Sequence, residues 1–106
     1  MPWTVAVRSP TDAELEALPA DIRARFSRYV ALIETQRLEG LRQPHAKHLE
    51  GRLWEMRLIS RDGIARVIYV TASGRGVVVV RAFVKNTQRT PRRELDPALQ
   101  WAREVR

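Results

Sequence analysis

The basic side chains between positions 47 and 85 are the residues of this sequence whose types and spacing could do chemistry. Arg57, Arg66, Arg81 and Lys85 fall within three apolar segments that predict consecutive β-strands. Guanidinium and ammonium groups bind phosphate oxygens, and arginine does so through two parallel hydrogen bonds. A cluster of such side chains on one surface therefore indicates a site for a polyanion.

The alternation of apolar residues predicts which side chains of these strands share a face. Asp62-Gly63 is a typical two-residue hairpin turn, which would place Arg57 opposite Ile68. A second turn near Gly74-Arg75 would bring in the third strand. We expect a core face of Trp54, Met56, Leu58, Ala65, Val67, Tyr69, Thr71, Val78, Val80, Ala82 and Val84. The opposite face would carry Glu55, Arg57, Arg66, Arg81, Phe83 and Lys85 with Leu53, Ile59, Ile68, Val77 and Val79.

Four cations on one sheet face would lie close together, because neighbouring strands are about 4.8 Å apart. Like charges at such distances repel one another unless an anion lies between them. In the predicted arrangement, Glu55 is the one acidic residue that shares their face. A phosphate-binding surface explains this placement. The alternative is an ordinary half-exposed sheet whose cations extend into solvent, with Glu55 pairing with Arg57 or a neighbour.

The N-terminal third of the chain predicts one strand and two helices. Residues 3–7 alternate in the manner of a short strand, which fits the edge of a sheet. Thr11 and Glu14 have the spacing of a capping box and predict a helix that ends before Pro19. Apolar residues at helical spacing predict a second helix over residues 20–39.

The remaining segments complete an α+β fold. Residues 41–51 show no clear period and predict a loop that could include one helical turn. Thr90 as N-cap and Pro91 at the first position predict a terminal helix, which Pro97 either kinks or restarts. The expected architecture is a small antiparallel sheet, formed by a three-stranded C-terminal meander and an N-terminal edge strand. Two N-terminal helices would pack on one face, and a C-terminal helix would complete the fold.

Composition limits the class of protein. With 106 residues and 44% hydrophobic content, the chain suits one domain over residues 1–106. It has no cysteine, which excludes disulfides and cysteine-based metal or redox sites. No apolar run approaches the ~18 residues of a membrane span. The N-terminus also lacks the layout of a signal peptide. We therefore expect a cytoplasmic protein that has no membrane partner.

The positive charge is unevenly distributed along the chain. Residues 1–40 hold five arginines against six acidic residues, whereas residues 41–106 hold fourteen basic residues against six acidic ones. A net charge of +7 with this asymmetry favours a nucleic-acid partner. The alternative is a solvated surface that is merely rich in arginine.

Two histidines near Lys47 suggest further chemistry. His45 and His48 are three residues apart, but no third ligand is evident, so we expect no metal. His48 is a candidate proton donor or RNA contact, or alternatively an exposed loop histidine. Phe83 could stack on a base or pack under the last helix.

Several motifs in the correct order resemble the RelE/HigB superfamily of toxin–antitoxin mRNA interferases, in particular its phage-related HigB-like branch. The resemblance spans most of the chain. The matching positions are Lys47, Leu49, Gly51, Leu53, Trp54, Glu55, Met56, Arg57, Arg66, Val67, Tyr69, Phe83, Lys85, Thr90 and Pro91. Three departures are Asn86 in place of a second lysine, Ala65 in place of an aromatic residue, and Pro97 within the final helix.

The resemblance implies a RelE-like microbial RNase fold and cleavage of mRNA in the ribosomal A site, without a cofactor. Its implied catalytic residues are Lys47, Arg57, Arg66 and Lys85. Further RNA contacts would be His48, Glu55, Arg81, Phe83 and Arg89. Implied partners are mRNA, the ribosomal RNA of the 30S A site and an antitoxin, usually of the helix-turn-helix type.

The two lysines of the chain strengthen this interpretation. Of the 19 basic residues only Lys47 and Lys85 are lysines, and both fall at motif positions. A lysine crowded by cations exchanges a proton nearer neutrality, which a guanidinium does not. Arg57 and Arg66 would then hold the scissile phosphate, while a lysine transfers a proton. The alternative function is a non-catalytic basic module that binds RNA or ribosomes, or a decayed toxin that retains only antitoxin binding.

Overall fold

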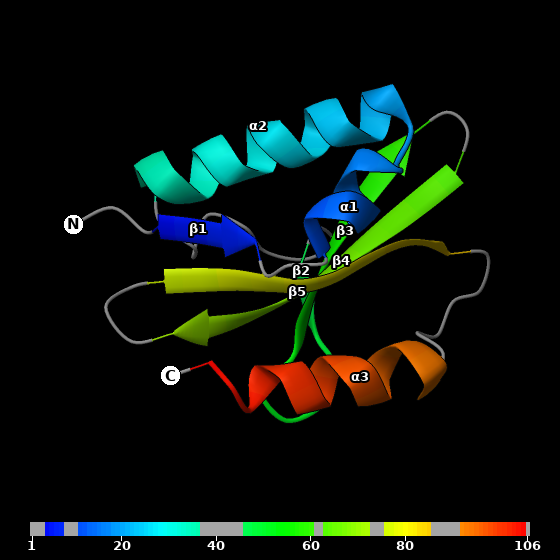
Figure 1. Cartoon of the computed structure of the whole chain (residues 1–106). Coiled ribbons are helices and arrows are strands. Elements are labelled where there is room, and N and C mark those ends of the chain that lie inside the picture. Colours follow the sequence, from blue (N-terminus) through cyan, green and yellow to red (C-terminus); the bar gives the residue numbers. More distant parts are fainter. Residues whose placement is uncertain are drawn as a thin grey trace.

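The computed structural model describes residues 4–7, 11–36, 46–60, 63–72, 76–85 and 92–105. Five strands and three helices follow one another along this part of the chain (Figure 1). They are β1 (Thr4–Val7), α1 (Thr11–Glu16), α2 (Ala20–Gln36), β2 (Ala46–His48), β3 (Trp54–Ser60), β4 (Gly63–Ala72), β5 (Gly76–Lys85) and α3 (Arg92–Ala102).

The strands form one sheet in the order β1-β5-β4-β3-β2. The antiparallel meander β3-β4-β5 and the N-terminal edge strand are confirmed, and with them the predicted α+β class. Two details differ from the prediction. β1 runs parallel to β5, so the sheet is mixed. The segment predicted as a loop contributes β2, which forms the other edge antiparallel to β3.

The helices cover both faces of the sheet (Figure 1). The predicted pair α1 and α2 lies on one face, where Ile22 and Ile33 are buried against Met56, Leu58 and other sheet residues. α3 lies on the opposite face. The cluster there is formed by Leu53, Ile68, Val70, Val80, Ala98 and Ala102. Two apolar layers therefore sandwich the sheet.

The helix ends differ from the prediction in two places. The predicted capping box is not formed: the Thr11 hydroxyl is buried without a hydrogen-bond partner among the described residues, and the Glu14 carboxylate accepts from the backbone N–H of Ala82 at 3.2 Å. α3 continues through Pro97 and does not restart at Asp96, whose carboxylate instead accepts a hydrogen bond from Arg92 at 2.8 Å.

The register of the first hairpin differs from the prediction by two residues. Arg57 faces Arg66, not Ile68, because Ser60 pairs with Gly63 and the glycine lies within β4. Side chains alternate with a period of two, so a shift of two residues leaves every one of them on its predicted face. The predicted faces of β3 and β4 therefore hold despite the wrong pairing.

A β-bulge between β4 and β5 overturns part of the predicted face assignment. Ile68 pairs with Arg81 while Tyr69 pairs with Val79, so Val80 is the additional residue of β5. A bulge reverses the alternation on its far side. Val77 and Val79 consequently belong to the core under α1 and α2, and Val78 and Val80 to the cluster under α3, the opposite of the prediction. Ala82 is buried as predicted, and Val84 is 49% exposed.

Candidate functional site

Two arginines meet on the sheet face that α3 partly covers. Arg57 on β3 and Arg66 on β4 are directly opposite each other in the register. Like charges in this position are destabilising. Glu55 lies between them: Arg66 Nη1 donates a hydrogen bond to Glu55 Oε1, and Arg57 Nε is 3.9 Å from the same oxygen. One carboxylate thus contacts both guanidinium groups.

The three side chains differ in their access to solvent. Glu55 is fully buried, and the side chain of Arg66 is only 5% exposed. The side chain of Arg57 is 31% exposed. Its Nε is buried and makes no hydrogen bond with any described residue. Arg57 is therefore the member of this group that an anion can reach from solvent.

Lys47 joins the group from the neighbouring edge strand. It is the register partner of Glu55, and residues directly opposite each other in an antiparallel pair project to the same face. Its side chain is exposed. Lys47, Arg57 and Arg66 are thus brought together around Glu55 across three adjacent strands.

Of the predicted site residues on β5 and just after it, the structure describes the side chain of Phe83 but not those of Lys85 and Arg89. Phe83 is opposite Arg66 and packs against the cluster beneath α3, which favours the packing interpretation over base stacking. Lys85 is the register partner of Ile64 at the end of β5, and its side chain lies outside the described residues. Arg89 also lies outside them.

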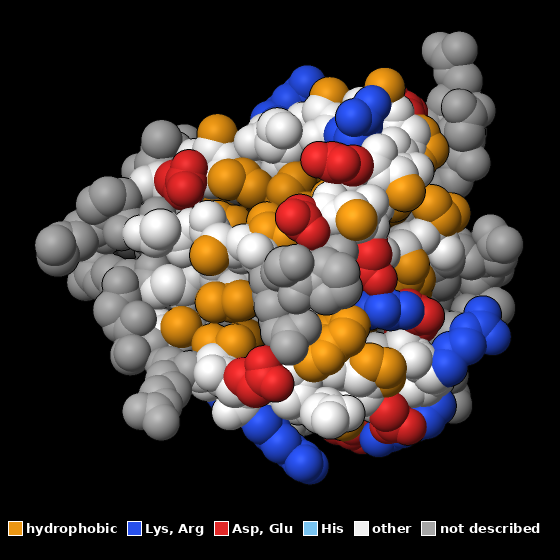
Figure 2. All heavy atoms as spheres, viewed as in Figure 1, with side chains coloured by type: hydrophobic (Ala, Val, Ile, Leu, Met, Phe, Trp, Pro, Cys, Tyr) orange, Lys and Arg blue, Asp and Glu red, His pale blue; other side chains and the backbone are white. Residues whose placement is uncertain are grey.

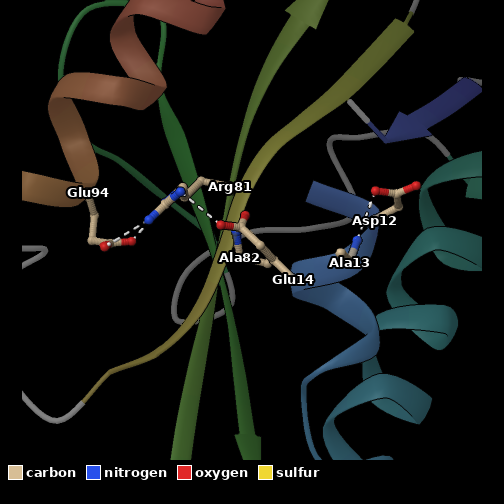
Figure 3. Close-up of polar contacts among 6 residues, drawn as sticks. All are labelled: Asp12, Ala13, Glu14, Arg81, Ala82 and Glu94. Carbon is tan, nitrogen blue, oxygen red and sulfur yellow. Dashed lines mark hydrogen bonds and ion pairs between the residues drawn. The ribbon is translucent and has the colours of Figure 1, made fainter. Parts of the chain in front are cut away.

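Arg81 is held between two helices (Figure 3). Its Nε donates to Glu94 of α3 at 2.9 Å, and its Nη1 is 2.8 Å from Glu14 of α1. The hydrogen bonds that Arg81 donates to Glu94 raise the pKa of Arg81, with the charges of Glu14 and Glu94 acting in the same direction against the effect of burial. Its guanidinium also lies 5.7 Å from the centre of the Trp101 ring.

The expectation that Glu55 alone offsets the strand cations is therefore wrong for Arg81. The sequence analysis missed Glu14 and Glu94 because their contacts with Arg81 join segments far apart in the chain. Arg81 links α1, β5 and α3, whereas Arg57 has no comparable bidentate partner among the described residues.

The turn between β2 and β3 fixes this part of the sheet to α3. Arg52 donates to the carbonyl oxygens of Ala102, the last residue of α3, and of Val105 just beyond it, both at 2.8 Å. At the other end of α3, Arg92 and Glu50 form two hydrogen bonds of 2.9 and 3.1 Å. The hydrogen bond from Arg92 lowers the pKa of Glu50.

His48 lies on the opposite sheet face from Lys47, since it follows Lys47 directly in β2. Its Nε2 is 2.8 Å from the carbonyl oxygen of Gly51, and its ring centre is 5.1 Å from that of Trp54. The prediction that Trp54 is a core residue is wrong, because it is 39% exposed. Trp54 is the first residue of β3 and borders the short edge strand, where its cross-strand partner is the exposed His48.

The visible side of the molecule in Figure 2 carries apolar side chains across its middle, with most lysines and arginines toward the margins.

No group of three or more possible metal ligands occurs among the residues that the structure describes. None of the helices in that part of the chain has the length and apolarity to cross a membrane.

Comparisons with known proteins identify relatives of this fold. The model of the family described as phage derived protein Gp49-like (DUF891) matches residues 13–103. The E. coli toxin RelE, in a mutant form in the free state, has 12% identity and a TM-score of 0.68, covering 95% of this chain and 98% of that one. A chain of the archaeal RelE-RelB complex from Pyrococcus horikoshii has 21% identity and a TM-score of 0.63, covering 79% and 96%. A chain of the RelBE2 toxin-antitoxin complex from Mycobacterium tuberculosis has 19% identity and a TM-score of 0.59, covering 80% and 100%. No curated protein matches.

Proposed function

Since the chain belongs to the phage-derived Gp49-like family, we propose that it is the toxin of a type II toxin–antitoxin system, acting as a ribosome-dependent endoribonuclease on mRNA. The resemblance to the RelE/HigB superfamily, inferred from motif positions, is confirmed by the family model and by the fold. One observation supports the proposed activity most directly: Arg57, Arg66 and Lys47 lie around Glu55 on adjacent strands.

The proposed reaction needs no metal ion or cofactor, because RNA supplies its own nucleophile. The 2′-oxygen loses its proton and attacks the adjacent phosphorus, and the bond to the 5′-oxygen breaks, leaving a cyclic phosphate and a 5′-hydroxyl. The protein must position the backbone and stabilise the charge that accumulates on the phosphorane oxygens. Preorganised guanidinium groups suit this task because they remain charged and bind two oxygens at once.

The exposures of the side chains suggest distinct roles. Arg57 is accessible and would contact the scissile phosphate directly. Arg66 is buried against Glu55 and would hold the positive potential in place behind Arg57. Glu55, whose carboxylate already accepts from Arg66, is better suited to orienting the arginines than to removing a proton. Lys47 or Lys85 would then transfer the proton.

An antitoxin is the expected protein partner. Two of the similar structures are complexes of a RelE-type toxin with its antitoxin. For this chain we propose a helix-turn-helix antitoxin that covers the sheet face carrying Lys47, Arg57 and Arg66. We further propose that the protein acts in the cytoplasm, on the 30S A site.

Brief induction in cells followed by mapping of transcript 5′ ends tests the proposal. We expect growth arrest, relief by co-expression of the antitoxin, and in-frame cuts confined to translated regions. Arg57→Ala should abolish the cuts, while Arg25→Ala, which removes an exposed arginine of α2, should not. RNA binding without cut transcripts would instead identify the non-catalytic module.

A further inference from the structure

Trp54 is an exception on its face of the sheet. The next two side chains of β3 on that face, Met56 and Leu58, are at most 1% exposed, whereas Trp54 is 39% exposed. Among the described residues, the exposed large apolar side chains are Val7, Trp54, Ile59, Ile64 and Val84, so Trp54 is the aromatic member of that set. An exposed aromatic ring on a basic protein is the feature on which unpaired bases stack.

His48 extends the exposed aromatic surface and is held in a fixed orientation. A carbonyl oxygen can only accept, so Nε2 carries the proton in the 2.8 Å contact with Gly51. The turn that presents this carbonyl is itself closed by a hydrogen bond from Leu49 N to Leu53 O at 2.9 Å. Gly51 has a backbone φ of 56°, which residues other than glycine rarely adopt. The two rings meet at 63°, with centres 5.1 Å apart. This arrangement exists before any ligand binds, which lowers the entropy lost on binding.

An exposed pair of rings with exposed cations nearby offers a stacking surface and phosphate contacts, the two features by which single-stranded RNA is bound. Lys47 precedes His48 in the edge strand and is exposed on the other face of the sheet. The acidic residue of the neighbouring turn, Glu50, is already bound by Arg92. Trp54 and Arg57 are three residues apart on β3, which corresponds to about 10 Å. A single strand that crosses the β2 edge would meet Arg57, Lys47 and Trp54 in turn.

We propose that Trp54 and His48 form a stacking site for one unpaired nucleobase, on the sheet face opposite to Arg57 and Arg66. RNA would therefore wrap around the β2 edge, with its cut phosphate on one face and a flanking base on the other. This inference deepens the proposed function, since it names a second contact for the same RNA. The binding itself can be measured without cleavage.

Fluorescence anisotropy with a short single-stranded 2′-O-methyl oligoribonucleotide tests the site, because the blocked 2′-oxygen prevents cleavage. Stacking of one base is worth roughly tenfold in affinity or more, so Trp54→Ala should weaken binding by about that factor. Trp54→Phe, which keeps a ring, should stay within about threefold of the wild type. Val84→Ala, which shortens an exposed apolar side chain elsewhere on the sheet, should leave affinity unchanged. Circular dichroism checks that each variant is folded.

Several results would overturn the inference. One is binding by folded Trp54→Ala within twofold of the wild type. Another is loss of antitoxin binding alone in that variant, which would make the surface a protein contact. Failure of the wild type to bind the oligonucleotide would also reject it. If Trp54→Ala weakens binding while the wild type cuts no mRNA on ribosomes, the stacking site stands and the proposed nuclease function fails.

Discussion

The buried ion pair of Glu55 and Arg66 should make the stability of this fold depend on both partners together: removing either one should destabilise it more than removing both. Glu55 is fully buried and Arg66 is 5% exposed, so neither charge can turn to water if the other is removed. Removing Glu55 would in addition leave Arg66 directly opposite Arg57 without a carboxylate between them. Both effects destabilise the folded state.

The expected size follows from this burial. Loss of one partner of a buried pair costs about 3–5 kcal/mol, because the remaining buried charge loses its hydrogen-bonded counter-charge. A domain of this size has a free energy of unfolding of about 5–15 kcal/mol, so Glu55→Met alone should remove a large part of it. Replacing both Glu55 and Arg66 by methionine should cost less than about 1–2 kcal/mol, since apolar pairs of similar volume replace buried ion pairs without large loss.

Urea unfolding of the wild type, Glu55→Met, Arg66→Met and the double variant measures this coupling. Both single variants should unfold at much lower urea concentration, and the double variant should recover most of the difference. Single variants within about 1 kcal/mol of the wild type, or a double variant as unstable as the sum of the singles, would refute the assigned role of the pair.

Three further changes test the contacts that surround the site. Arg81→Ala removes the cation that Glu14 and Glu94 contact and should lower the free energy of unfolding by about 2–3 kcal/mol in urea. Arg81→Lys should restore only part of it, because an ammonium group cannot donate to both carboxylates as the planar guanidinium does. An unchanged urea midpoint for Arg81→Ala would contradict the role of Arg81 as a link between α1 and α3. Burial raises the pKa of Tyr69 to about 12, so the folded state keeps a proton that the unfolded state loses above about pH 10. The free energy of unfolding should therefore be unchanged below pH 10 and fall by about 2–3 kcal/mol as the pH approaches 12. Tyr69→Phe should show a smaller fall in unfolding experiments across this range. Arg52→Ala removes three hydrogen bonds to the carbonyls of Ala102, Val105 and Thr71 and should speed amide exchange in the last turn of α3, whereas exchange in α2 should not change.

The faces of β3 and β4 could be predicted from the sequence because charged and apolar residues alternate there. Even a wrong pairing, with Arg57 opposite Ile68 instead of Arg66, left each side chain on the correct face, since the error was an even number of residues. β5 offered no such control. Its run of valines at 77–80 fits either face, so the bulge that reverses the alternation leaves no trace in the residue types.

The long-range contacts of the site could not be predicted from spacing. Glu14 matched a capping box as well as any local pattern allows, but its carboxylate is used by Arg81 and the Ala82 amide, almost 70 positions away. β2 is only three residues long, too short to show a period. Trp54 was assigned to the core because it alternates in step with Met56 and Leu58, but at the start of β3 its neighbour is the exposed His48 of this short edge strand. Tertiary pairing, not local preference, decides these positions.

Cleavage of an mRNA by the purified protein in a reconstituted translation reaction tests the central claim most directly. The wild type should cut the message only when it is being translated. Arg57→Ala should lose about 100-fold or more of this rate with its fold intact, while Arg25→Ala should match the wild type. Equal cutting by folded Arg57→Ala, or an uncut message in the presence of active wild-type protein and translating ribosomes, would contradict the account.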